Sequence, residues 1–217
     1  MRLGRYFLAI ACVLLVSSAA SATPITVLVG DKDGFGAGCA VPGSCPSVTT
    51  TPVVDNRSAA EAAAVNGAQI TDVFSSVFAG FGPNPNVANV IFPFGGTLTS
   101  ATITFAGADF QSDVFGALGA NVNGVATPFS FPDGRNVTAL HSIVLSPAML
   151  TAANLAGVVN LNLNRSTSGD FISFDYFELN GDTATTSTTP VPEPATLTLL
   201  GVGLAGGALR LRRRRTA

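Results

Sequence analysis

The sequence predicts an all-β fold for the middle of this chain of 217 residues. The chain contains no Trp and two Tyr but fifteen Phe, and Gly, Thr, Asn and Ser are frequent, a composition that favours strands joined by turns over helices. Short runs in which apolar and polar residues alternate recur along the chain, and turn residues separate them. We therefore expect a β-sandwich, in which two packed sheets each bury one face.

Eight strands are expected, and the alternation of apolar and polar residues is clearest in two of them. Leu98, Ile103 and Phe105 are set against threonines, and Leu161 and Leu163 are set against asparagines, so one face of each strand is apolar. Their spacing along the chain suits a sandwich. The expected strands are residues 25–29, 88–94, 97–106, 117–122, 125–131, 137–145, 158–164 and 170–179.

Turn and helix signals complete the fold prediction. Asn123 and Gly124 lie between two apolar runs, and this pair favours the left-handed backbone of a two-residue type I′ hairpin. Short connecting helices are expected at residues 59–65 and 147–153, the second with Ser146 as its N-cap and a proline at its first position. Antiparallel strands with minor helices indicate a jelly-roll or galactose-binding-like sandwich rather than an α/β fold.

The N-terminal residues have the pattern of a secretory signal peptide. Arg2 and Arg5 precede an apolar run at residues 6–16, and Ala-Ser-Ala at residues 20–22 is a cleavage site of the A-x-A type. The apolar run is shorter than the ~20 residues that span a bilayer, so an uncleaved anchor helix is the less favoured alternative. We expect residues 1–22 to direct the chain to the Sec translocon and to be removed by signal peptidase.

The remainder of the chain divides into a domain, a linker and a tail. Residues 23–182 are the expected exported β-sandwich domain, residues 183–190 form a Thr/Ser-rich linker, and residues 191–217 form the tail. Between residues 23 and 190 the chain has four basic and twelve acidic residues, a formal charge of −8. This acidic balance argues against nucleic acid as a partner, because phosphate binding requires clustered Lys and Arg.

The tail has three parts in a fixed order: a Pro-Glu-Pro motif, an uncharged run at residues 195–209, and a cluster of arginines. The prolines on either side of Glu193 hold it in an extended backbone that an enzyme could read. At ~1.5 Å per residue the apolar run reaches about 22 Å as a helix, less than the ~30 Å hydrocarbon core of a bilayer. We expect a C-terminal membrane-sorting helix in the inner membrane, with the arginines on the cytoplasmic side. The arginines are Arg210, Arg212, Arg213, Arg214 and Arg215.

This tail resembles the PEP-CTERM sorting signal of exported proteins in Gram-negative bacteria. Pro192, Glu193 and Pro194 match the signature tripeptide, the glycines of the apolar run suit its membrane segment, and the arginines match its basic end. The resemblance implies that an exosortase, a membrane-embedded cysteine protease or transpeptidase, processes the chain. It also implies delivery to the cell surface or the extracellular polysaccharide matrix. Like other sorting signals it is an address, and it says nothing of the domain's activity.

Cys39 and Cys45 enclose a short loop that contains Pro and Gly. Because thiols are oxidised outside the cytoplasm, we expect these two residues to form a local disulfide. A metal site is the weaker interpretation, since two cysteines without histidine neighbours cannot complete a zinc shell.

Acidic residues near the start of the domain are candidate metal ligands. Asp31 and Asp33 lie one residue apart on a loop that also contains glycines, an arrangement that lets carboxylate oxygens converge on a hard cation such as Ca²⁺. Asp175, in the last expected strand, is the third ligand that we select. A solvated turn in which Asp bonds to its own backbone is the alternative. Further candidate ligands are Asp109, Asp113 and Glu178.

The last expected strand also suggests a function. Residues 171–179, Phe-Ile-Ser-Phe-Asp-Tyr-Phe-Glu-Leu, resemble the last strand of carbohydrate-binding jelly-rolls. The resemblance implies a calcium-dependent carbohydrate-binding module as one alternative for the domain, with extracellular polysaccharide as its partner. The absence of Trp limits the surface on which sugars could stack.

Catalysis is not expected, and no catalytic residue is assigned. His141 is the only histidine, so a Ser-His-Asp or Cys-His arrangement would rest on it alone, and no nearby serine lies in a G-x-S-x-G context. The surplus of carboxylates leaves a polysaccharide hydrolase with two catalytic acids as a second alternative. The leading interpretation is a structural or adhesive domain on an exported protein.

Overall fold

The computed structural model describes residues 22–36, 55–78, 80–131 and 138–184, together with residues 201, 203 and 204. The chain divides into two compact units, of which Ala22–Thr185 is one. In the other unit the described residues are Gly201, Gly203 and Leu204, and all three are helical. No helix in the described part of the chain is long and apolar enough to cross a membrane.

Several predicted features lie outside the described residues. They are the signal peptide up to residue 21, the cysteine pair Cys39 and Cys45, the Pro-Glu-Pro motif and the arginine cluster. The disulfide and the cleavage after residue 22 therefore stay predictions.

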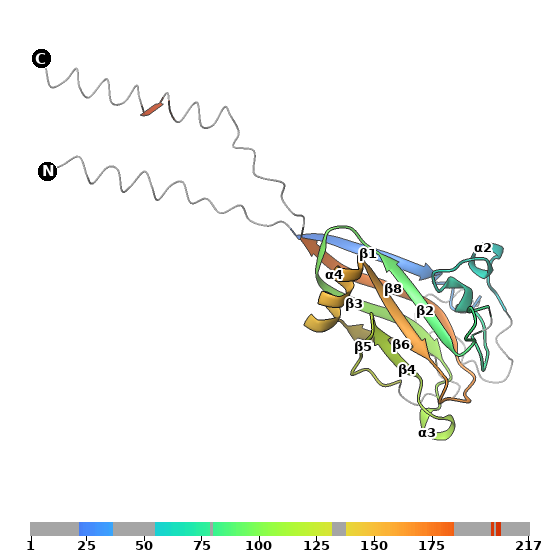
Figure 1. Ribbon diagram of the computed structural model, residues 1–217. Helices are drawn as coiled ribbons and strands as arrows, with labels where there is room; N and C mark the ends of the chain where they lie inside the picture. The colour runs from blue at the N-terminus through green and yellow to red at the C-terminus, as the bar shows by residue number, and fades with distance from the viewer. Residues whose placement is uncertain are drawn as a thin grey trace, which may run out of the picture. The chain divides into compact units, whose positions relative to one another are not determined.

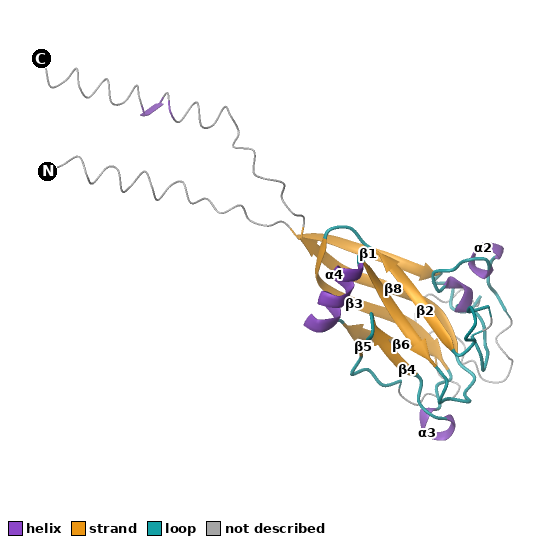
Figure 2. Ribbon diagram, in the orientation of Figure 1, coloured by secondary structure: helices purple, strands orange, loops and turns teal. Residues whose placement is uncertain are grey.

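The domain is a sandwich of two four-stranded antiparallel sheets, with short helices and loops at its edges (Figure 1 and Figure 2). One sheet has the order β1-β8-β3-β6 and the other has the order β2-β7-β4-β5. This architecture confirms the predicted all-β sandwich. The strands are β1 (Ala22–Gly30), β2 (Val87–Pro93), β3 (Thr97–Ala108), β4 (Gly119–Val122), β5 (Val125–Ala126), β6 (Thr138–Val144), β7 (Val158–Asn164) and β8 (Ser173–Ala184).

The core forms where the alternation of side chains turns apolar residues inward. In β7, Leu161 and Leu163 are fully buried, whereas Asn160 and Asn162 between them are partly exposed. Side chains of a strand point alternately to the two faces of its sheet, so the leucines lie between the sheets and the asparagines lie outside. Phe105 of β3 is fully buried in the same core. The bounds predicted for β7 and β3 differ little from the observed ones, because both strands follow the alternating pattern closely.

The first strand of the domain pairs along its whole length with the last strand. The register between β1 and β8 runs from Ala22 opposite Ala184 to Gly30 opposite Tyr176. On its other side β8 pairs with β3, so β8 is an interior strand of its sheet. The chain therefore enters and leaves this unit at one end of the β1–β8 pair, and the loop that follows Gly30 lies at the opposite end (Figure 1).

Several strands differ in their bounds from the predictions, among them β8 and β5. β8 begins at Ser173 and continues to Ala184, so the first two residues of the expected linker are paired in the sheet. β5 ends at Ala126, although a strand over residues 125–131 was expected. Thr127 still donates its backbone N–H to Ala120 (3.3 Å), but the next residue is Pro128, which has no N–H with which to continue the ladder.

The structure confirms the predicted turn at Asn123–Gly124 and the predicted start of the longer helix at Ser146. Asn123 and Gly124 have φ values of 50° and 80°, as a type I′ turn requires. Helix α4 (Pro147–Ala156) begins with Ser146, whose side chain accepts the backbone N–H of Met149 (3.4 Å). The helix runs three residues past its predicted end and stops at Gly157, which has a left-handed backbone with φ 69°.

The other helices are short. Helix α2 (Ala59–Ala62) begins in a capping box formed by Ser58 and Glu61 and ends earlier than the predicted residue 65. A 3₁₀ turn, η1 (Ala68–Ile70), follows Gly67, and helix α3 (Ser112–Phe115) was not expected. None of these elements interrupts the two sheets.

A matched pair of leucines tests the position of the core. Leu161 of β7 is 0% exposed and Leu155 of α4 is 90% exposed. We expect Leu161→Ala to lower the free energy of unfolding by about 2–5 kcal/mol, because it leaves a cavity in the core. Leu155→Ala should change it by less than about 0.5 kcal/mol. Urea unfolding followed by circular dichroism measures both, and equal losses would contradict the assigned core.

Candidate metal centre

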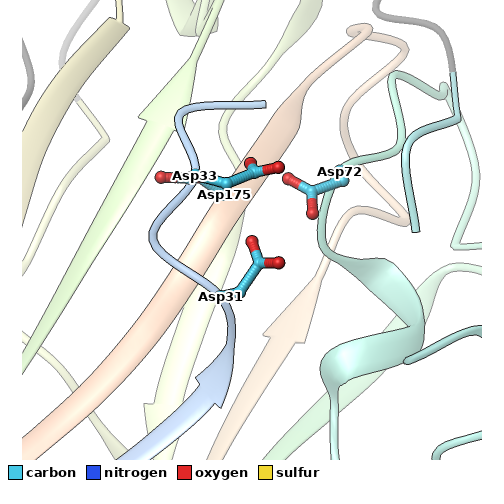
Figure 3. Close-up of side chains that lie close together, drawn as sticks. All are labelled: Asp31, Asp33, Asp72 and Asp175. Atoms are coloured by element: carbon cyan, nitrogen blue, oxygen red, sulfur yellow. The ribbon is translucent and has the colours of Figure 1, made fainter. Parts of the chain in front are cut away.

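Four aspartates bring their carboxylates together at the end of the β1–β8 pair. Oxygen atoms of Asp31, Asp33, Asp72 and Asp175 lie within 4.8 Å of one another, and we call these residues the aspartate cluster. In Figure 3, Asp31 and Asp72 point towards Asp175 from separate segments of the chain. The three residues that the sequence predicted as ligands lie together, and Asp72 lies with them; their role as ligands stays a prediction.

The loop that carries Asp31 and Asp33 depends on a glycine at the end of β1. Gly30 has φ 80°, and a Cβ there would lie 2.8 Å from the Thr71 side chain and 2.9 Å from the backbone oxygen of Asp175. Only glycine adopts this left-handed backbone readily and also leaves room for the chain to pass between Thr71 and Asp175. The close passage places Asp31 beside both of them.

Asp175 anchors this loop to β8. Its Oδ1 accepts the backbone N–H groups of Gly34 and Phe35, each at 3.0 Å. Both donors belong to the loop after β1, so one carboxylate oxygen of an interior strand fixes the loop. The other oxygen, Oδ2, remains available to the centre of the cluster.

Asp33 and Asn56 connect the loop to the segment that follows η1. The Oδ1 atom of Asp33 accepts the backbone N–H of Gly36 (2.7 Å), and its Oδ2 accepts the side-chain amide of Asn56 (2.9 Å). Asn56 also donates its backbone N–H to the backbone oxygen of Asp72 (3.2 Å). Asn56 therefore positions Asp33 and Asp72 relative to each other.

Asp72 is the most unusual member of the cluster. It has a left-handed backbone with φ 56°, and its backbone N–H donates to Phe174 in β8 (2.6 Å). Its side chain is 0% exposed, and both carboxylate oxygens are buried without a hydrogen-bond partner. An ionised carboxylate in this state is costly unless a proton or a cation neutralises it.

The electrostatics of the cluster reflect burial and mutual repulsion. Burial, and then the negative charges of Asp33 and Asp175, raise the pKa of Asp72 to about 8. Burial also raises the pKa of Asp175 to about 6, against the lowering effect of the N–H groups that its carboxylate accepts. The pKa of Asp31 is raised by burial and by the charge of Asp33. The charges of neighbouring carboxylates thus make ionisation of Asp72, Asp175 and Asp31 less favourable.

The nearby basic side chains are engaged with other acids. Lys32 pairs with Glu178 at 2.6 Å, and Arg57 pairs with Asp55 at 2.5 Å. Within the described ranges, no ion pair joins a basic side chain to the aspartate cluster. The arrangement leaves four acidic groups facing one another, and chemically it suits a hard cation bound by oxygen ligands.

The other candidate ligands lie elsewhere. Glu178 forms the ion pair with Lys32, Asp109 is buried near Asp170 and raises the pKa of that residue, and Asp113 belongs to α3. None of the three is part of the cluster. Asp72 was missed because no motif surrounds it, and its burial depends on a bridge between Thr71 and Phe174, which are distant in sequence.

His141 is packed among aromatic rings in the core. Its ring centroid lies 5.2 Å from that of Phe105 and 5.5 Å from that of Phe110. Its Nε2 atom is buried without a hydrogen-bond partner, and burial lowers its pKa. In this position the ring serves as a core residue.

Comparison with known proteins assigns the tail. The PEP-CTERM protein-sorting motif matches residues 190–215, which include the Pro-Glu-Pro tripeptide and the arginine cluster. This match confirms the resemblance found in the sequence and marks the chain as an exported protein that an exosortase sorts. The comparison with curated proteins returns no match.

One solved structure with a similar chain is dimeric latent PorU from Porphyromonas gingivalis. The two chains are 15% identical with a TM-score of 0.39, and the alignment covers 81% of this chain and 15% of that chain. This chain thus spans a small part of that protein, and a likeness of this level does not bear on function.

The electrostatics of the cluster predict how stability varies with pH. The pKa of Asp72 is about 8 in the folded protein but near 3.8 when the chain unfolds, so between these values the folded state binds more protons. The free energy of unfolding should therefore fall as pH rises from about 4 to about 8 in the presence of a chelator. Asp175 adds to the fall between about 4 and 6.

The control for this pH dependence is Asp72→Asn, which keeps the side-chain shape and removes the charge. The charged groups that act on Asp72 include Asp33, Asp175, Asp31 and Glu61, and all of them remain in this variant. Thermal unfolding at pH 5 and pH 8 should show a melting temperature that falls less in the variant than in the wild type. Equal falls in both proteins would contradict the assigned pKa.

Proposed function

We propose that this chain is an exported protein that acts at the cell surface or in the extracellular polysaccharide matrix, where its β-sandwich is a structural or adhesive domain and not an enzyme. The observation that supports the proposal is the PEP-CTERM motif at residues 190–215. In this proposal the Sec translocon exports the chain, the apolar segment holds it in the inner membrane, and an exosortase acts near Glu193. The mature domain is then released from its tail.

A structural or adhesive role agrees with the chemistry of the described residues. The only histidine of the chain is packed among phenylalanine rings, so general acid–base catalysis would have to rest on carboxylates alone. In the described part of the chain, one carboxylate oxygen from each residue of the aspartate cluster lies within 4.8 Å of the others, less than the ~5–9.5 Å that separates the two acids of glycosidases. This spacing favours cation binding over hydrolysis.

A second candidate function, carbohydrate binding, is favoured by a row of amide side chains on the outer face of the second sheet. Asn162 of β7 lies between Asn121 of β4 and Asn89 of β2 in the strand register. Asn121 donates to Asn162 (3.1 Å), and Asn162 donates to Asn89 (3.0 Å). Each amide has two donors and two acceptor positions, so the row retains groups that could bind sugar hydroxyls.

A surface hollow adjoins this row. Phe81, Asn84, Val87 and Asn89 are among the residues that line it. Phe81 is partly exposed, and an aromatic ring beside amide groups is the combination that binds the apolar and polar faces of a sugar ring. The row and the hollow together offer an extended surface for a polysaccharide chain.

The sorting proposal is tested by deleting residues 191–217. In a host that contains the exosortase, the wild-type protein should lose its tail, as shown by the mass of the mature chain, and should reach the surface or the medium. The deletion variant should be missorted. Glu193→Ala should keep its tail and stay with the inner membrane, because the residue held between two prolines is changed. Loss of the tail from Glu193→Ala as in the wild type, together with wild-type location of the deletion variant, would contradict the proposal.

The carbohydrate proposal is tested on an array of bacterial polysaccharides with and without calcium. We expect Asn89→Ala combined with Asn162→Ala to weaken binding at least tenfold, since two amides of the row are lost, which corresponds to about 1.4 kcal/mol. Asn180→Ala, a substitution of the same kind in β8 of the other sheet, should bind as the wild type does. Absence of binding by the wild type across the array would count against this function.

A further inference from the structure

We propose that the aspartate cluster binds one Ca²⁺ ion, which locks the loop after β1 to β8 and to the segment after η1. The site is separate from the sorting motif and does not depend on the proposed function. Two independent observations point to a ligand. One is the convergence of four carboxylates, and the other is the fully buried side chain of Asp72, which faces them with both oxygens unpartnered.

The unpartnered carboxylate of Asp72 requires a positive charge or a proton at its oxygens. Arg57 lies near enough to respond to the charge of Asp72, but its guanidinium pairs with Asp55 and donates to the backbone oxygen of Gln69. Lys32 is paired with Glu178. A divalent cation at the centre would neutralise Asp72 and relieve the repulsion among all four carboxylates at once.

The spacing of the oxygens agrees with the size of a calcium shell. Ca²⁺ binds oxygens at about 2.3–2.6 Å, so two ligands on opposite sides of the ion are roughly 4.6–5.2 Å apart. The ligand atoms of the cluster lie within 4.8 Å of one another. An ion at their centre would therefore need little rearrangement of the aspartates.

The available lone pairs also suit this ion. Both oxygens of Asp72 have no partner, and Asp175 uses Oδ1 for two backbone N–H groups, which leaves Oδ2 for the ion. Asp31 is exposed and Asp33 is partly exposed, so water has access on their side to complete six to eight ligands. The cluster contains neither His nor Cys, which disfavours zinc and copper.

Calcium is favoured over magnesium by the nature of the ligand set. Mg²⁺ demands near-octahedral geometry, keeps several waters and is usually held by one or two carboxylates. Here four carboxylates come from three chain segments and one of them is fully buried. Such a crowded and irregular shell of protein oxygens is the kind that Ca²⁺ accepts.

Binding would connect the beginning of the domain to its end. Asp31 and Asp33 follow the first strand, Asp175 lies in the last strand, and Asp72 is held to that strand through its N–H bond to Phe174. The unfolded chain cannot bring these residues together, so the ion binds the folded state and stabilises it by mass action.

The first test is thermal unfolding of the purified exported protein after removal of metal ions, with CaCl₂ or MgCl₂ added back. We expect Ca²⁺ to raise the melting temperature on the order of 5–10 °C at a hundredfold excess over Kd, and Mg²⁺ to raise it much less. An unchanged melting temperature with Ca²⁺ would overturn the site, and equal shifts with both ions would overturn the assignment to calcium.

Variants localise the ion. Asp72→Asn should abolish the calcium-induced shift, and the exposed change Asp31→Asn should weaken calcium binding at least tenfold in isothermal titration without affecting folding. Asp170→Asn is the matched control, because Asp170 is also a buried acid but lies outside the cluster. It should keep the full shift. Retention of the wild-type shift by both cluster variants would overturn the proposal even if one of them folds poorly.

Terbium luminescence provides a direct readout. The chain has no Trp and two Tyr, Tyr6 in the expected signal peptide and Tyr176 in β8, so Tyr176 is the single sensitiser of the mature protein and adjoins Asp175. Excitation of tyrosine should produce Tb³⁺ emission that Ca²⁺ displaces. Tyr176→Phe should lose the emission but keep the calcium-induced shift. Emission that Ca²⁺ does not displace would contradict a shared site.

Discussion

The antiparallel pairing of β1 with β8 is the constraint on which the rest of the structure depends. It joins the first strand of the domain to an interior strand that also pairs with β3. The sheet therefore cannot be completed without the strands at both ends of the domain. The same pairing brings the loop after Gly30 next to Asp175. The positions of the two domain ends and of the aspartate cluster therefore follow from one strand register.

Local patterns predicted the features that arise locally. The alternation of leucine and asparagine in β7, the Asn123–Gly124 turn and the Ser146 cap of α4 could all be recognised because their causes lie within a few neighbouring residues. The end of β5 was missed although its cause, Pro128, is also local. The role of Asp72 has no local cause. Asp72 donates its backbone N–H to Phe174, about a hundred residues away in sequence, and no property of its own neighbours indicates that contact.

The sorting motif and the candidate binding residues lie in different parts of the chain. The sorting motif occupies residues 190–215, whereas the aspartate cluster and the asparagine row belong to the compact unit Ala22–Thr185. A sorting signal that is read apart from the domain leaves the domain free to change its binding surfaces without losing its destination. We propose carbohydrate binding on the outer face of the sheet β2-β7-β4-β5, and the amides of that face contribute to neither the core nor the cluster.

The pairing of first and last strands has a consequence for the order of events during export. A chain that crosses a membrane from its N-terminus delivers β1 first, yet the partner of β1 is the last strand to emerge. Contacts between residues so distant in sequence form slowly, and here they cannot form at all until translocation of the domain is almost finished. The aspartate cluster also forms late, because Asp31 can approach Asp175 only after Asp175 has crossed the membrane. The sheet that contains β1 and β8 can therefore be completed only after the last strand of the domain has crossed.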